Sequence, residues 1–72
     1  MKKYNLYSFA MYEESPPILY IIDPDRTDHN VLYYKDPGKK WEECKLTWSD
    51  NILLLMKFVR DMTEEEVFTE ML

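Results

Sequence analysis

The chain has 72 residues, of which 46% are hydrophobic, 15% aromatic and 32% charged. This composition excludes a disordered tail and a low-complexity chain, and it predicts one small domain over residues 1–72. The longest purely apolar run, Ile52–Met56, is too short to span a bilayer. A chain of this length buries only ~60% of the surface of its unfolded form, so a deep catalytic cavity and an enzyme are not expected.

The charge is unevenly distributed along the chain. Residues 1–60 hold nine acids and nine bases, whereas the last twelve residues add five acids and no base, which accounts for the net charge of −5. Nucleic acids bind through Lys and Arg, so this end disfavours direct nucleic-acid binding and favours a basic protein partner. In the alternative interpretation, the acids only favour the first turn of a helix and keep the protein soluble.

The first part of the chain reads as strands separated by turns. We expect a strand over Lys3–Tyr12 that ends at Pro16 and Pro17, a second over Ile18–Ile22 and a third over Val31–Lys35. The segment Asp36–Lys39 combines Pro and Gly and predicts a tight hairpin.

The segment Trp41–Trp48 predicts a fourth strand with Cys44, Leu46 and Trp48 on one face, although its first residues could also begin a helical turn.

The remainder of the chain has a helical pattern. Ser49 is the expected N-cap, and Trp48 is placed to pack on Leu53. The apolar residues that follow recur at helical spacing: Ile52, Leu55, Met56, Val59 and Met62. Thr63 and Glu66 form the pattern of a capping box, which predicts a break or bend at Asp61–Thr63. The predicted fold is α+β, an antiparallel three- to four-stranded meander followed by one C-terminal helix with a bend or a short second helix, with the helices on one face of the sheet.

The predicted strands are apolar on both faces. In the second strand, Ile18, Tyr20 and Ile22 alternate with Leu19 and Ile21. Helices on one side cannot cover both sets, so either the sheet curls around its own contents or an apolar face remains for a partner. The tyrosines could also lie half-buried at the sheet margin without a binding role.

Residues that could carry chemistry are few. His29 lies in a polar loop far in sequence from Cys44, and Cys44 is expected to pack as a small apolar residue. The acids from Asp23 to Asp28 lack the Gly and the Glu of a calcium loop and favour Asx-turns instead. We therefore expect no catalytic residue, no cofactor and no metal. A lone cysteine in so small a chain favours a reducing, cytoplasmic compartment.

The lysines beside the expected hairpin form only a small basic patch. Lys35, Lys39 and Lys40 lie next to Trp41, but neighbouring acids offset their charge, so we interpret this segment as a solvated hairpin tip.

One stretch resembles a known family. Val31-Leu32-Tyr33-Tyr34, a following turn and Trp, and then Ser49 at the start of an amphipathic helix, are similar to the closing segment of SUKH-type bacterial immunity proteins. The resemblance covers less than half of the chain and implies a non-catalytic, cytoplasmic protein that binds another protein. We carry over no site residue from it.

Together these observations predict a non-enzymatic, acidic inhibitor that occludes or neutralises a partner protein, as phage- or plasmid-borne anti-defence proteins, anti-CRISPR-like proteins and immunity proteins do. The expected partner is a protein with a basic groove such as a nucleic-acid channel, without direct nucleic-acid or membrane binding. The predicted contact residues are the acids of the last helix and aromatic residues of the sheet: Glu64, Glu65, Glu66, Glu70, Tyr7, Phe9, Tyr20 and Tyr33. The alternative is a homodimeric structural or assembly protein that pairs through its apolar sheet face.

Overall fold

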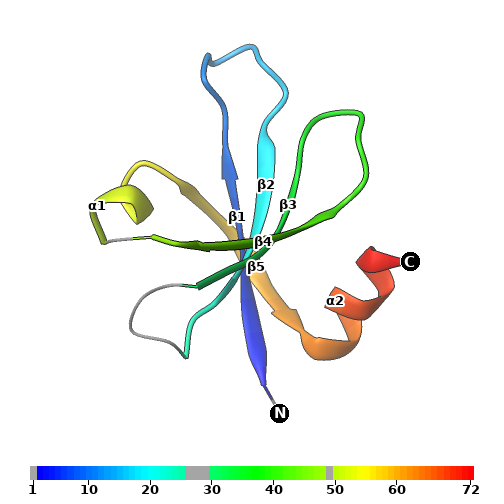
Figure 1. The fold of residues 1–72 in the computed structure, drawn as a ribbon. Helices are drawn as coiled ribbons and strands as arrows, with labels where there is room; N and C mark the ends of the chain where they lie inside the picture. Colours follow the sequence, from blue (N-terminus) through cyan, green and yellow to red (C-terminus); the bar gives the residue numbers. More distant parts are fainter. Residues whose placement is uncertain (1, 26–29, 49) are drawn as a thin grey trace.

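The computed structural model describes residues 2–25, 30–48 and 50–72 of the chain (Figure 1). These residues form an α+β fold with one antiparallel sheet and a C-terminal helix, as predicted. In chain order the elements are β1 (Lys3–Phe9), β2 (Ile18–Asp23), β3 (Asn30–Lys35), β4 (Glu42–Thr47), α1 (Asp50–Leu53), β5 (Lys57–Thr63) and α2 (Glu64–Met71).

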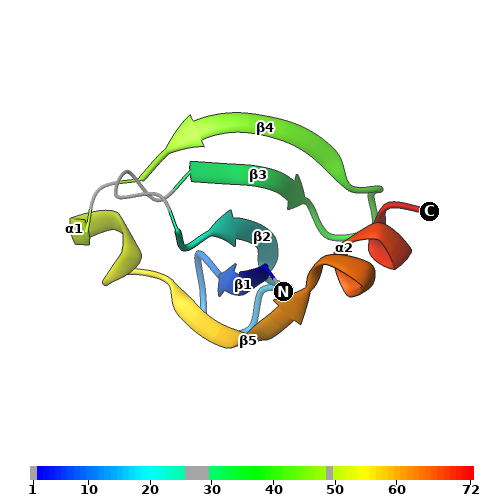
Figure 2. The same ribbon diagram turned by 90° about the horizontal axis from the view of Figure 1, so that it is seen from below.

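Within the described residues the sheet has five strands in the order β4-β3-β2-β1-β5. The first four strands form the expected meander, and the chain then returns after α1 so that β5 pairs antiparallel with the free side of β1. In Figure 2 the strands are stacked from β4 to β5, and α1 and α2 lie on opposite sides of this stack, at the left and the right of the view. β4 and β5 are therefore the two edge strands.

The sheet is strongly twisted, and its strands fan out when viewed along the stack (Figure 1). The register shifts explain how the outer strands follow this twist. Between Ile21 and Ile22 of β2 the partner in β3 moves from Tyr33 to Val31, and similar shifts occur between β3 and β4 and between β1 and β5. Each shift adds one residue to the outer strand, and such bulges increase the local right-handed twist.

The buried side chains form two clusters, one on each face of the central strands. Ile21 belongs to the first cluster with Met62 of β5 and Val67 of α2. Its neighbour Ile22 belongs to the second cluster with Val31 and Trp48. Because consecutive residues of a strand point to opposite faces, the two clusters lie on opposite sides of β2.

The prediction that the helices lie on one face is therefore wrong. Val67 and Met71 of α2 pack on the Ile21 cluster, whereas Leu53 of α1 and Met56 pack on the Ile22 cluster. Both faces of the sheet thus have a helical cover, and the argument from one uncovered apolar face no longer holds. These covers help to bury Ile21 and Ile22, but other apolar strand residues stay exposed: Leu46 is 61%, Phe58 49% and Val59 46% exposed.

The prediction of a continuous helix through Met62 is also wrong. The helix α1 ends at Leu53, and Lys57–Thr63 form strand β5. The apolar spacing did not distinguish the two structures, because Phe58, Val59 and Thr63 are also residue types that favour strands. Pairing with β1 decides the outcome, since a helix here would leave the edge of β1 without hydrogen-bond partners.

Several local predictions are confirmed. The hairpin at Asp36–Lys39 closes with a backbone hydrogen bond from Lys39 N to Asp36 O of 3.0 Å, and Gly38 adopts a φ of 76° that glycine tolerates without strain. The Asx-turn expected after β2 is present, since the Asp25 N–H donates to Asp23 Oδ1 at 3.0 Å. The predicted cap Ser49 and the loop residue His29 lie outside the described residues.

Candidate protein-binding surface

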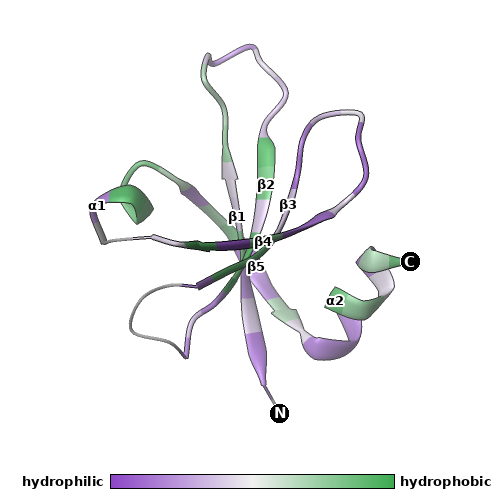
Figure 3. Ribbon diagram, in the orientation of Figure 1, coloured by the Kyte–Doolittle hydropathy of each residue, from purple (hydrophilic) through white to green (hydrophobic). Residues whose placement is uncertain are grey.

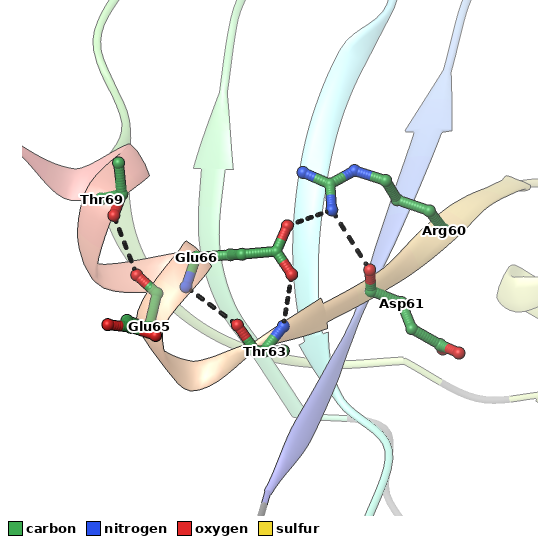
Figure 4. Close-up of polar contacts among 6 residues, drawn as sticks. All are labelled: Arg60, Asp61, Thr63, Glu65, Glu66 and Thr69. Carbon is green, nitrogen blue, oxygen red and sulfur yellow. Dashed lines mark hydrogen bonds and ion pairs between the residues drawn. The ribbon is translucent and has the colours of Figure 1, made fainter.

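The helix α2 begins at a capping box, as predicted from the sequence (Figure 4). The backbone N–H of Glu66 donates to Thr63 Oγ1 at 3.2 Å, and the Thr63 N–H donates to Glu66 Oε1 at 3.1 Å. This pair of hydrogen bonds satisfies backbone donors that have no partner within the helix. The start of α2 is thus fixed immediately after the last residue of β5.

An ion pair connects the same glutamate to β5. Arg60 Nη1 lies 2.5 Å from Glu66 Oε2 and also donates to the carbonyl of Asp61 at 3.3 Å (Figure 4). The hydrogen bond from Arg60, followed by that from the Thr63 backbone, lowers the pKa of the Glu66 carboxyl below its usual 4.5. Glu66 therefore orients α2 on the sheet, and its carboxylate is already occupied within the chain.

Glu70 has a structural contact as well. Its Oε2 accepts a hydrogen bond of 3.2 Å from the indole N–H of Trp41, which precedes β4. This contact joins the last turn of α2 to the β3–β4 hairpin. The hairpin lysines line a shallow hollow there together with the end of α2: Lys35, Lys39, Lys40, Trp41, Glu70, Met71 and Leu72. Lysines are favourable at a helix C-terminus, and α2 has no basic residue in its own last turn.

Glu64 and Glu65 differ from the other two predicted glutamates. Both are exposed, and within the described part of the chain neither carboxylate forms an ion pair or a side-chain hydrogen bond. The predicted acidic cluster thus divides into two residues that hold the fold and two that face solvent without a partner. Of these four glutamates, Glu64 and Glu65 are the two whose carboxylates have no partner among the described residues.

An apolar groove runs along the junction of α2 with the sheet and has a volume of about 310 Å³. We call it the α2 groove, and its lining comes from β1, β3 and α2: Tyr4, Leu32, Tyr33, Glu64, Val67, Phe68 and Met71. Phe68 is 70% exposed although it lies beside the buried Val67. Glu64 places an unpaired carboxylate in the wall of this apolar groove.

The structure brings Tyr33 and Glu64 together in the α2 groove but places the other predicted aromatic residues elsewhere. Tyr7 and Tyr20 pack on the Ile22 cluster, where Tyr20 contacts Trp48 edge-on at a centroid distance of 4.6 Å and Tyr7 contacts Phe58 at 5.6 Å. Burial raises the pKa of the Tyr20 hydroxyl above 10.0. Phe9 is half-buried at the end of β1.

Sequence reasoning missed Phe68 as an exposed aromatic residue. The sequence pattern of the last helical turns predicts one apolar side, opposite the glutamates, that contains Val67, Phe68, Met71 and Leu72. Successive helical residues differ by about 100° around the axis, so Phe68 is turned away from the sheet when Val67 and Met71 face it. The sequence did contain a signal for the exposure of Phe68. In a short helix that packs one face on a sheet, adjacent residues such as Val67 and Phe68 are rarely both buried.

Cys44 is half-buried and packs on the Ile22 cluster, which confirms the prediction that it behaves as a small apolar side chain. Leu46, expected on the same face, pairs with Val31 but is 61% exposed on the edge strand β4. Among the described residues, no group of three His, Cys, Asp or Glu side chains could hold a metal ion. In the same part of the chain, no helix has both the length and the apolar character to cross a membrane.

The chain matches no family model, no curated protein and no solved structure. The similarity to SUKH-type immunity proteins therefore has no support from these comparisons. The helix on which it partly rested has only four residues here.

Proposed function

We propose that this protein acts without catalysis by binding another protein, and that α2 with the α2 groove is its contact surface. The observation that carries the proposal is the position of Phe68, a large exposed aromatic side chain beside an apolar groove that Glu64 borders. Aromatic anchors in or beside a groove, surrounded by polar groups, are the usual centre of a protein interface.

The mechanism that we propose is occlusion of a basic surface on the partner. The unpaired carboxylates of Glu64 and Glu65 attract a cationic protein and speed the encounter, and the net charge of −5 acts in the same direction. Phe68 and the apolar groove walls then set how long the complex lasts. A nuclease channel or another nucleic-acid-binding groove has the required charge, as expected for inhibitors of host defence or immunity proteins.

A pair of charge reversals tests the proposal. The variant Glu64→Lys with Glu65→Lys reverses two acids of the contact surface, and Glu13→Lys with Glu14→Lys reverses two adjacent, exposed acids in the β1–β2 loop. Both variants change the net charge equally. Each variant and the wild type are immobilised, and proteins retained from an extract of the native host are quantified by mass spectrometry.

We expect a specific partner to bind the wild type and the Glu13/Glu14 variant and to be lost from the Glu64/Glu65 variant. The retained partner should also dissociate more readily as the salt concentration rises, because exposed charges are screened. A partner that binds all three proteins equally would show that α2 is not the contact surface.

A further inference from the structure

The strand β4 presents an open edge along one side of the sheet. Among the described elements, only β3 makes extensive contact with β4, whereas the opposite edge strand β5 also contacts α2. Figure 2 shows β4 as the outermost strand of the stack. Apart from the half-buried Cys44, the residues of β4 are exposed. The outward backbone groups of such a strand are a template for pairing with another chain, and β4 contains no proline that would prevent it.

The side chains of β4 alternate regularly between the two faces of the sheet. Trp41, one residue before the strand, packs on the Ile21 cluster, whereas Cys44 and Trp48 lie with the Ile22 cluster. The register shift between β3 and β4 therefore does not interrupt the alternation within β4. Figure 3 shows hydrophilic and hydrophobic residues in close succession along this strand. The residues of β4 on the same face as Trp41 are Glu43, Lys45 and Thr47.

Glu43 and Lys45 are a free acid and a free base on one face of β4. Both side chains are exposed, and within the described part of the chain neither forms an ion pair or a side-chain hydrogen bond. The third charged residue of the strand, Glu42, lies on the other face and accepts a hydrogen bond of 2.6 Å from the Tyr34 hydroxyl. The free pair lines a shallow hollow whose other lining residues carry no charge: Asn30, Leu32, Tyr33, Cys44 and Thr47.

This pattern makes β4 complementary to itself. Two antiparallel registers related by a two-fold axis pair all but one residue of the strand, one centred on Cys44 and the other on Lys45. The register centred on Lys45 places the two Lys45 side chains opposite each other. The register centred on Cys44 instead places Glu43 opposite Lys45 of the second copy, and the two-fold axis repeats this pair. Opposite charges directly across two strands stabilise the pairing, and like charges destabilise it.

The other charges near β4 do not oppose the register centred on Cys44. It places Glu42 opposite the exposed Leu46 of the second copy, and it places Lys40, before the strand, opposite Trp48. The acids of the last twelve residues belong to β5 and α2, which pack on each other and on β1 rather than on β4. At an ionic strength of about 0.15 M, the Debye length of about 8 Å also screens the net charge of each copy.

We infer that β4 pairs antiparallel with β4 of a second copy of this chain, in the register centred on Cys44. The second copy is the partner because the same strand supplies both halves of the contact, with acid and base in the positions that a two-fold axis requires. The two sheets then join edge to edge into one continuous sheet, and the open backbone groups of both strands gain partners. The contact is small, so the association is weak and depends on concentration.

Edge pairing also has a consequence for partner binding. Among the described residues, none from β4 lines the α2 groove. A dimer therefore presents two copies of the proposed contact surface, and a partner with two sites would bind it more tightly than the monomer. The inference goes beyond the proposed function and does not require it.

Charge reversals on β4 test the register. Glu43→Lys and Lys45→Glu each place like charges opposite one another, so each variant alone should associate about tenfold or more weakly than the wild type. In an equal mixture, a strand with two lysines faces a strand with two glutamates, so mixed dimers should form at least as well as wild-type dimers. The double variant Glu43→Lys with Lys45→Glu exchanges the two charges and should associate like the wild type.

The matched controls carry the same charge changes away from β4. Glu13→Lys in the β1–β2 loop and Lys39→Glu in the β3–β4 hairpin alter exposed residues, and they should associate like the wild type both alone and mixed. Circular dichroism checks that all variants keep the fold. Analytical ultracentrifugation with a reducing agent present, over a concentration series up to about 1 mM, measures association.

Cys44 provides a second, geometric test. Directly opposed residues of antiparallel strands have Cα atoms about 4.5–5.5 Å apart, within the range of about 4.4–6.8 Å found in disulfides. Diamide, which accepts the two electrons and two protons that a pair of thiols releases, should therefore link two wild-type chains through Cys44. The control Cys44→Ser with Leu46→Cys moves the thiol to a more exposed position that faces Glu42 of the second copy, and it should link more slowly.

Three outcomes would overturn the inference. A wild type that stays monomeric throughout the series shows that β4 does not pair with itself. A mixture of Glu43→Lys and Lys45→Glu that associates no better than either variant alone shows that these residues do not face each other. Faster linkage through the thiol at position 46 than through Cys44 shows that the register is not centred on Cys44. None of these outcomes bears on the binding of a foreign protein to α2.

Discussion

The two ends of this molecule differ in how they are built. α2 is defined by short-range hydrogen bonds, with a capping box at Thr63 and Glu66 and an ion pair from Arg60 in the preceding strand β5. In the α1–β5 segment, local hydrogen bonds close only the turn after α1, and the strand β5 itself depends on pairing with β1. A structure encoded by neighbouring residues can be predicted from sequence, whereas one that depends on a distant strand cannot.

The largest expected loss of stability comes from substitutions in the two buried clusters, one of which lies beneath each end. Ile21 and Ile22 are adjacent, and their exposures are 0% and 1%, but they face opposite clusters. Either Ile→Ala change should cost about 2–5 kcal/mol of the free energy of unfolding, because it leaves a cavity. Urea denaturation measures the loss, and Ile→Val variants, with an expected cost of about 0.5–1.5 kcal/mol, serve if the alanine variants do not fold.

The two alanine variants should destabilise different parts of the structure. Ile21→Ala should speed amide hydrogen exchange in α2, and Ile22→Ala should change the fluorescence of Trp48, whose exposure is only 7%. Equal effects on both reporters would mean that the two clusters form one cooperative unit.

A second comparison uses two phenylalanines. Phe58 of β5 packs edge-on against Tyr7 at 5.6 Å, whereas Phe68 of α2 is 70% exposed. Phe58→Ala should lower the free energy of unfolding by about 1–2 kcal/mol through lost burial and the lost ring contact. Phe68→Ala should change it by less than about 0.5 kcal/mol. Thermal unfolding measures both, and the reverse order would contradict the placement of residues 57–63 in a strand.

The capping box gives a smaller and more local effect. Thr63→Ala removes the side-chain acceptor for the Glu66 N–H and should cost about 1 kcal/mol. Thr69→Ala is the control, because its hydroxyl donates to the Glu65 carbonyl inside the helix and caps nothing. Helical circular dichroism and amide exchange in α2 report the result. Equal losses from the two variants would show that the cap does not define the start of α2.

The smallest effect concerns pH. The pKa of Glu66 is lowered in the folded protein, so its contribution to stability is complete above its usual value of 4.5 and is lost as the pH falls through the folded value. Glu66→Gln should remove this part of the acid dependence, whereas Glu65→Gln should leave it unchanged. Unfolding midpoints between about pH 2 and pH 7 measure the difference. An unchanged profile in Glu66→Gln would rule out this glutamate as the source.

Much of the fold could be predicted, and the failures have a common cause. Strands β2 and β3 were predicted within one residue at each end, because prolines and polar loops delimit β-branched and aromatic runs. The helical spacing of apolar residues from Ile52 to Met62 led to the wrong prediction of a helix, because residues of this segment also suit a strand. For the candidate site, the sequence identified the acids of α2 but could not separate the bound Glu66 and Glu70 from the free Glu64 and Glu65.

The sequence by itself determined β2, β3, the hairpin at Gly38 and the cap of α2, since neighbouring residues specify each of them. It predicted a first strand to Tyr12, whereas β1 ends at Phe9, and it left a helical turn open for the segment that forms β4. Only the tertiary structure decided that β5 joins β1, that each face of the sheet receives its own helix, and which apolar side chains stay exposed. Those features depend on contacts between residues far apart in the chain, and no local pattern encodes them.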